Sequence, residues 1–331
     1  MKHEDPDKPR EPRRAKIIPF PAPPGAAAAP APAPIVPEFP QDVMELLEDY
    51  EPEQIELVIE MISRLLQFSS TGAIDKVPMN LSDAERQARA QEAVADAYEA
   101  PDDEFAMAAL MDALDFDPEN VEALLMLVER LAGELPDSVG LYERVLRMAQ
   151  EQLGPEVFRQ QRGNFWAIHE TRPYMRARHA LARELLYESR PKEAAAHWEE
   201  MLELNPNDNQ GVRYLLLSVY LTQNDQKGIE RLYQGYPGDE SFSAPFAWGR
   251  VLQRLLAGEQ RRAEMALQKA RHVNPYLEAY LNGTKRAPKK LPLFYTPHGA
   301  DEAKIFAADY ASAWKKHPEA RKWLKARWIP S

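Results

Sequence analysis

Apolar residues recur at helical spacing in residues 175–208, in two stretches that a break at Ser189–Pro191 separates. The apolar positions lie on one face of each stretch, and a proline closes the segment; they are Leu181, Ala182, Leu185, Ala194, Trp198 and Met201, followed by Pro206. This pattern predicts two amphipathic helices joined by a short turn. One such hairpin cannot bury its own apolar face, so further hairpins are expected beside it.

The pattern returns in segments 81–118, 119–152, 209–242 and 244–277. In the first of these, Ser82 followed by Glu85 predicts a capping box at a helix start. Three segments close on the same kind of dipeptide, with proline as a stop signal just past the helix: Asp117–Pro118, Asn205–Pro206 and Asn274–Pro275. The chain is therefore predicted to be all-α, with a solenoid of about five helical hairpins over residues 81–283.

Two segments leave this period. Residues 153–174 are too long for a junction between repeats. Residues 284–331 predict two further helices that carry aromatic residues on one side: Phe306, Tyr310 and Trp314, then Trp323 and Trp328. We expect these helices to cap the last repeat, because the open end of a solenoid exposes an apolar face.

The N-terminal part differs in composition. Residues 1–40 contain 12 prolines, and proline fixes φ and lacks an amide donor, so a disordered arm with polyproline-II character is predicted. Residues 41–68 predict a pair of helices, the second beginning at Pro52, and residues 69–80 predict a linker. No signal peptide is expected, because the first basic residues lead into Pro–Ala sequence and not into an apolar core.

The 34-residue spacing of the hairpins resembles that of tetratricopeptide (TPR) repeats. Three stretches, GNFWAIHETRPYMRAR, NPNDNQGVRYLLL and LPLFYTPHGADEA, together with a late tryptophan, resemble a group of mostly bacterial TPR proteins that is distantly related to the suppressor of tumorigenicity 7 family. The resemblance covers about residues 81–328. It implies a helical solenoid with a concave binding surface, and it implies no enzymatic activity.

Charge is distributed unevenly along the chain. The net charge is +1 in residues 1–40, −19 in 41–150, zero in 151–283 and +7 in 284–331. An acidic front half and a basic tail favour either self-complementary packing or two surfaces with different partners. The chain has no cysteine, which excludes disulfides and thiolate metal sites, and no apolar run is long enough to span a membrane. A cytoplasmic location without membrane contact is expected.

In TPR proteins the first helix of each hairpin lines the groove. The resemblance therefore implies which residues of this chain face the groove. They are Arg176, His179 and Arg183 in one repeat, and Asn209, Gln210 and Arg213 in the next. Arginine suits an acidic peptide because its guanidinium makes paired hydrogen bonds to carboxylates. The alternative is that these arginines form a solvated face or pair with Glu170, Glu184 or Glu188.

The long segment before this repeat carries Trp166 and Arg172. One interpretation is a binding loop folded over the groove. The favoured alternative is structural: Pro173 starts a helix, Thr171 or Arg172 caps it, and Phe165 and Trp166 are buried.

No catalytic or metal motif stands out. His169–Glu170 is half of a zinc-protease motif, but residue 173 is proline, and the seven histidines are scattered, so neither a metal nor another cofactor is expected. The sequence predicts a non-enzymatic scaffold that binds an acidic or extended protein segment in the groove. The alternative is a nucleic-acid- or anion-binding protein that uses Arg176, Arg183, Arg213 and the basic tail, against which the acidic charge of the whole chain argues. The sequence does not specify the oligomeric state.

Overall fold

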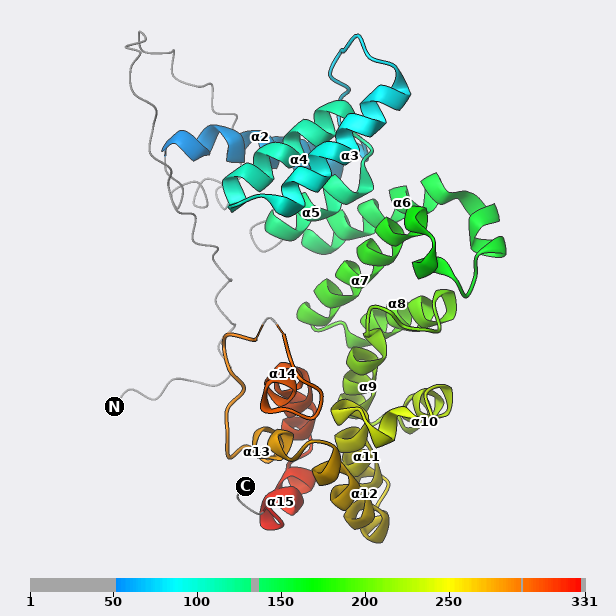
Figure 1. Ribbon diagram of the computed structural model, residues 1–331, viewed down its shortest axis with the longest axis vertical. Helices are drawn as coiled ribbons and strands as arrows, with labels where there is room; N and C mark the ends of the chain where they lie inside the picture. The colour runs from blue at the N-terminus through cyan, green and yellow to red at the C-terminus, as the bar shows by residue number, and fades with distance from the viewer. Residues whose placement is uncertain (1–51, 132–136, 293, 329–331) are drawn as a thin grey trace. The chain divides into compact units, whose positions relative to one another are not determined.

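The computed structural model describes residues 52–131, 137–292 and 294–328 (Figure 1). All regular elements in these ranges are helices, which confirms the all-α prediction for this part of the chain. The predicted arm (residues 1–40) and the predicted helix within residues 41–51 lie outside the described residues. The chain divides into two compact units, residues 1–188 and residues 189–331, and each is described by itself.

Unit 1 consists of helices that pack in the order of the sequence. They are α2 (Pro52–Thr71), α3 (Asp83–Glu99), α4 (Asp103–Phe116), α5 (Val121–Leu131), α6 (Ser138–Gln160) and α7 (Arg172–Tyr187), with the 3₁₀ turns η2 (Phe165–Ala167) and η3 (His169–Thr171) before α7. Each helix from α3 to α7 contacts the next, and α5 also contacts α7. Helix α2 contacts α4, α5 and α6 with the apolar stripe that includes Val58, Ile62 and Leu65, which are all fully buried.

Local sequence sets where these helices begin. The predicted capping box is confirmed at α3, where the Ser82 hydroxyl accepts from the Glu85 amide at 3.3 Å and the Glu85 carboxylate accepts from the Ser82 amide at 2.9 Å. Helix α4 begins after Asp102, whose carboxylate accepts from the Phe105 amide at 2.9 Å. Each cap supplies an acceptor to a helix-end amide that has no partner within the helix.

The segment 153–174, which breaks the repeat period, forms a helix extension and two turns. Helix α6 kinks at Gly154, which has φ of 69° and ψ of 162° and precedes Pro155. Beyond the kink, the rings of Phe158, Phe165 and Tyr174 pack together with centroids 5.0 to 6.0 Å apart. This aromatic cluster buries Phe165 completely, so the extra length serves packing within unit 1.

The start of α7 differs in detail from the sequence prediction. Thr171 occupies the cap position, but its hydroxyl makes no capping bond. The hydroxyl instead donates backwards to the carbonyl oxygens of Phe165 and Ile168. The side chain therefore closes the η2–η3 turn, because a buried hydroxyl takes the nearest available acceptor.

Unit 2 also consists of helices. They are α8 (Pro191–Leu204), α9 (Val212–Gln223), α10 (Gln226–Gly235), α11 (Ala244–Leu256), α12 (Gln260–Val273), α13 (Glu278–Leu281), α14 (Ala300–Lys316) and α15 (Pro318–Ala326), with the 3₁₀ turns η4 (Asp239–Ser241) and η5 (Pro275–Leu277). Helix α9 contacts α8, α10 and α11, and α11 contacts α12. The boundary between the units falls between α7 and α8, inside the predicted hairpin 175–208.

The C-terminal helices α14 and α15 are part of unit 2 and pack against its other helices. Helix α14 contacts α9 and α11 as well as α13 and η5, and α15 contacts α14 and α11. The Tyr310 hydroxyl donates to the Tyr214 carbonyl at 2.8 Å, and the Ser218 hydroxyl donates to the Asp309 carbonyl at 3.0 Å. Tyr310 and Trp314 are fully buried, so α14 contributes side chains to the core of unit 2.

Within the described ranges, none of the helices combines the length and the apolar character that crossing a membrane requires.

Candidate functional site

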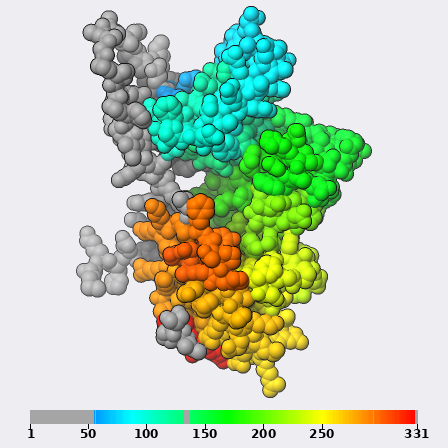
Figure 2. All heavy atoms as spheres, in the orientation of Figure 1, coloured from blue at the N-terminus to red at the C-terminus, as the bar shows by residue number. Residues whose placement is uncertain are grey.

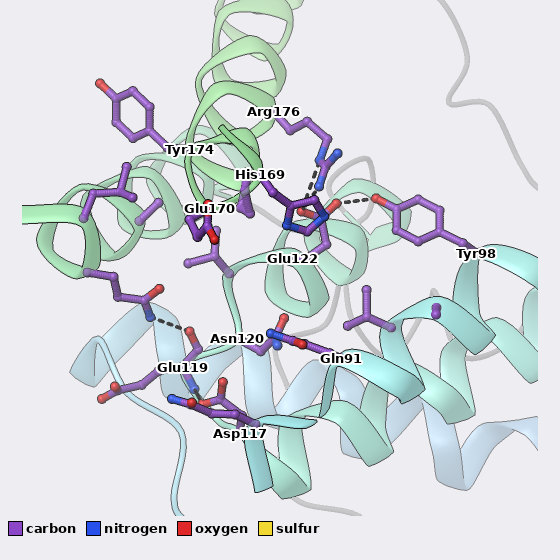
Figure 3. Close-up of a pocket in the computed structure, with 18 residues that line it drawn as sticks. Gln91, Tyr98, Asp117, Glu119, Asn120, Glu122, His169, Glu170, Tyr174 and Arg176 are labelled. Atoms are coloured by element: carbon purple, nitrogen blue, oxygen red, sulfur yellow. Dashed lines mark hydrogen bonds and ion pairs between the residues drawn. The ribbon is translucent and has the colours of Figure 1, made fainter. Parts of the chain in front are cut away.

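A pocket of about 540 Å³ opens within unit 1 (Figure 3). Its walls come from α3, the start of α5, the middle of α6 and the η3–α7 junction. Polar side chains from several helices converge on it, including Gln91, Asn120, Glu122 and Arg176. A cavity of this size with convergent polar groups is the leading candidate for a binding site in this unit.

Helix α3 presents one face to the pocket and the opposite face to the core. Gln87, Gln91, Ala95 and Tyr98 line the pocket, and spacings of three and four residues place them on one side of the helix. The alanine-rich face, with Ala90, Ala93 and Ala97, is buried. The small residues let α4 approach closely, so the longer polar side chains are left facing the cavity.

Glu122 joins three helices across the pocket floor. Its carboxylate accepts a hydrogen bond from the Tyr98 hydroxyl of α3. It also accepts from Arg176 of α7, with Nη2 at 2.6 Å and Nε at 3.1 Å. Glu122 is only 8% exposed, and Figure 3 shows the three side chains pointing toward one another. Two partners therefore satisfy a carboxylate that would be costly to bury alone.

This arrangement changes the acidity of the phenol. Burial raises the pKa of Tyr98 to about 12, and the hydrogen bond to the Glu122 carboxylate adds to the rise because it favours the protonated phenol. Tyr98 thus remains a hydrogen-bond donor throughout the physiological range. It has no role as a proton acceptor there.

The remaining polar groups are amides and carboxylates. Asn120 caps α5 by accepting from the Ala123 amide at 3.0 Å, and Gln152 donates to the Glu119 carbonyl at 2.7 Å. Asp117, Glu119 and Glu170 line the pocket together with Glu122. Burial raises the pKa of Asp117, so this carboxylate gains from a nearby positive charge.

Of the site residues that the sequence predicts in unit 1, only Arg176 lines the pocket. Its charge is paired to Glu122. Arg172 donates to the Trp166 carbonyl at 3.0 Å, and its guanidinium lies 5.6 Å from the centre of the indole ring. Trp166 and Arg172 lie outside the pocket lining. Both are half-buried, whereas the structural alternative predicted a buried Trp166.

His179 and Arg183 lie further along α7, outside the pocket lining. Burial, followed by the charge of Arg183, lowers the pKa of His179 to about 4. The imidazole is therefore neutral near pH 7. It does not supply the positive charge that an acidic ligand would require.

Unit 2 holds the other predicted site residues. Arg213 pairs with Asp208 at 2.8 Å and with Asp239 at 2.6 Å. Its guanidinium also lies over the rings of Tyr214 and Tyr236, at 4.2 and 5.1 Å from their centres. With 15% of the side chain exposed, Arg213 is part of an internal cluster that joins the start of α9 to η4.

The neighbours of Arg213 differ in exposure. Asn209 is exposed and Gln210 is half-buried, both in the turn before α9. These two residues and Arg213 belong to unit 2, whereas the other predicted site residues belong to unit 1. The sequence prediction therefore drew its residues from two separately described units.

Sequence reasoning missed Gln87, Gln91, Tyr98 and Glu122. The signal was present in α3, where polar side chains recur at helical spacing opposite an alanine-rich face. Among the described residues, no group of three or more histidine and acidic side chains is positioned to hold a metal ion.

Comparison with models of known protein families gives no match, and comparison with curated proteins gives none either. The resemblance to TPR proteins stays a prediction.

Proposed function

We propose that this protein is a non-enzymatic scaffold of the TPR type, and that the unit 1 pocket binds an extended protein segment. The observation that carries the proposal is the pocket itself, which draws its walls from α3, α5, α6 and α7. Of these, α3, α5 and α7 are first helices of predicted hairpins, and first helices line the binding groove of TPR proteins.

The amide side chains of the pocket suit a peptide backbone. An extended segment exposes unpaired N–H and C=O groups, and each amide side chain offers both a donor and an acceptor. Gln87 and Gln91 from α3 face the cavity with Asn120 and Gln152 from the other walls. This set can hold a main chain with little dependence on its sequence.

The charges of the lining favour a segment that contains a basic residue. The pocket has four carboxylates, from Asp117, Glu119, Glu122 and Glu170, against a single arginine. That arginine, Arg176, is already paired with Glu122. The predicted acidic ligand relied on unpaired arginines, so the geometry shifts the preference toward lysine- or arginine-containing segments.

Unit 2 has fewer free groups and less free helix surface for such a ligand. Helices α9 and α11, which are the first helices of their predicted hairpins, are in contact with α14. Arg213 is held by two aspartates. These contacts support a ligand site in unit 1 and a structural role for the predicted residues of unit 2.

A peptide library displayed on phage tests the proposal. Selected peptides are measured by calorimetry against the full chain and against Ala95→Trp, which fills the pocket from an exposed position on α3. We expect peptides enriched in lysine and arginine, and a loss of affinity of at least about tenfold in the variant.

The matched control is Ala88→Trp, which adds the same side chain to an exposed position of α3 outside the pocket lining. It should bind the selected peptides like the natural chain. Equal binding by Ala95→Trp, or a library that yields no enriched peptide, would count against a peptide site in this pocket.

A further inference from the structure

A basic loop, residues 284–298, joins α13 to α14 at the surface of unit 2 (Figures 1 and 2). Its sequence, TKRAPKKLPLFYTPH, contains four lysine or arginine residues and no acidic residue. Its three prolines, Pro288, Pro292 and Pro297, lack the amide donor that a regular helix needs. The loop is thus a strip of positive charge on a chain whose net charge is −11.

The four cations are exposed, and the Lys285 ammonium lies over the Tyr280 ring, 5.0 Å from its centre. Lys285, Arg286, Lys289 and Lys290 are all solvent-exposed. Within the described residues, the salt bridges of this end of the chain are Arg271–Glu278, Lys304–Asp301 and Arg327–Glu264, and none of them involves a loop cation. Charge of this kind contributes little to stability and is available for a ligand.

Exposed apolar side chains follow the cations directly. Phe294 is 86% exposed, and Leu291 and Tyr295 are 41% and 48% exposed. The Tyr295 ring rests edge-on against Phe306, with centroids 6.3 Å apart. Phe294 is thus an exposed aromatic ring in the same loop as four exposed cations. Aromatic rings and cations together hold the bases and phosphates of a single strand.

The ends of the loop are fixed to the core. The Asn274 amide is fully buried and donates to the Gly299 carbonyl at 3.0 Å and to Glu302 at 2.7 Å. Glu302 also accepts from the His298 amide at 2.8 Å, and the Lys285 amide donates to the Ala279 carbonyl at 2.8 Å. A loop anchored at both ends loses little further freedom when it binds.

From these features we infer that the basic loop binds single-stranded nucleic acid, with Lys285, Arg286, Lys289 and Lys290 on phosphates and Phe294 stacked on a base. A protein partner fits less well, because lysine is depleted in protein interfaces and Phe294 is not set in a pocket. An anionic bilayer is a broad plane that would meet the acidic charge of the whole molecule, whereas a strand can follow the loop alone. The inference does not depend on the peptide site in unit 1.

Fluorescence anisotropy of labelled oligothymidylate and oligouridylate, each of about 12 nucleotides, tests the inference on the full chain. At about 50 mM NaCl we expect binding, and a slope of about −3 for log K against log [NaCl], as four phosphate contacts imply. The two probes distinguish DNA from RNA as the source of the strand. Absence of binding to both at this salt concentration would overturn the inference.

Three variants locate the site. Changing Lys285, Arg286, Lys289 and Lys290 to glutamine should abolish binding. Phe294→Ala should weaken binding about tenfold and leave the salt slope unchanged, because stacking releases no counterions. The matched control changes four exposed lysines of α14 and α15 to glutamine, namely Lys315, Lys316, Lys322 and Lys325.

The control alters the net charge by the same amount and should bind like the natural chain. An equal loss of affinity in the control and the loop variant would show that net charge alone attracts the strand, and would overturn the assignment to the loop. Co-sedimentation with phosphatidylserine vesicles, lost in Phe294→Ala, together with no binding to either oligonucleotide would replace the strand with a lipid surface. Circular dichroism of each variant confirms that the helices remain.

Discussion

Glu122 shows how one carboxylate can organise a site. It takes hydrogen bonds from Tyr98 and Arg176, which lie on two other helices. Changing Glu122 to alanine would leave both partners without their acceptor. We expect the free energy of unfolding to fall by about 1–3 kcal/mol, the usual cost of unmade hydrogen bonds to a charged group. Urea denaturation measures this loss.

The control for Glu122 is Glu119→Ala, at an exposed pocket position. It should change stability by less than about 0.5 kcal/mol. Equal effects of the two variants would mean that the contacts of Glu122 contribute nothing beyond those of a surface carboxylate.

His179 should make the stability of unit 1 depend on pH. Burial lowers its pKa to about 4, from 6.5 for a free imidazole. Between these values the unfolded chain binds more protons than the folded chain, so stability is lost as the pH falls from about 6.5 to 4. At pH 4.5 the loss from this group should be on the order of 2 kcal/mol.

The pH effect is measured as a difference between proteins. Urea midpoints of the natural chain and of His179→Gln are compared from pH 7 to pH 4.5, since other groups also titrate in this range. The variant should show the smaller decline. An imidazole resonance of His179 that titrates near pH 6.5 would contradict the prediction directly.

At the scale of elements, the kink of α6 depends on one residue. Gly154 adopts φ of 69° and ψ of 162°, a region that side-chain-bearing residues rarely enter. An alanine Cβ there would meet no atom within 4 Å, so the cost of Gly154→Ala comes from the backbone alone. We expect a loss of about 1–3 kcal/mol in the free energy of unfolding.

The stability of Gly154→Ala is compared with that of Gly163→Ala. Gly163 also has positive φ and open space around it, but it lies in a turn outside the helix. Thermal unfolding of both variants checks the prediction. No loss of stability in Gly154→Ala would show that α6 can straighten freely at this point.

The helical elements could be predicted from periodicity, whereas the site could not. The spacing of apolar residues identifies a helix because helical periodicity involves only residues that are close together in the sequence. The pocket depends on which helix faces meet, and Glu122 looked like one more acid in a segment of net charge −19. The pairing of Arg176 could not be predicted, because Glu122 lies 54 residues away along the chain. Arg213 has one partner 26 residues away, Asp239, and a second only five residues away, Asp208.

At the scale of the molecule, the C-terminal region is part of unit 2. Trp314 is fully buried on α14, and the helix contacts α9 and α11. Trp314→Ala should therefore lower the free energy of unfolding by about 3–5 kcal/mol, the cost of a large cavity. Trp323 is only half-buried on α15, so Trp323→Ala should lower the free energy of unfolding by less. Urea denaturation compares the two, and equal small losses would contradict a core position for α14.

The two proposed sites differ in the sign of their charge. Carboxylates outnumber cations in the unit 1 pocket, whereas the basic loop of unit 2 has no acidic residue. Added salt should weaken both interactions, and more steeply at the loop, where a strand releases condensed counterions. The two proposals thus assign cationic and anionic partners to separate surfaces of one chain.

The cover that α14 forms over α9 and α11 also has a consequence for competition. A helix tethered to the surface it occupies acts at an effective concentration in the millimolar range. A free peptide at micromolar concentration would need roughly a thousandfold greater intrinsic affinity to displace it, or about 4 kcal/mol. Under the proposed function, a free segment should therefore bind the pocket of unit 1 in preference to the surface of α9 and α11 that α14 occupies.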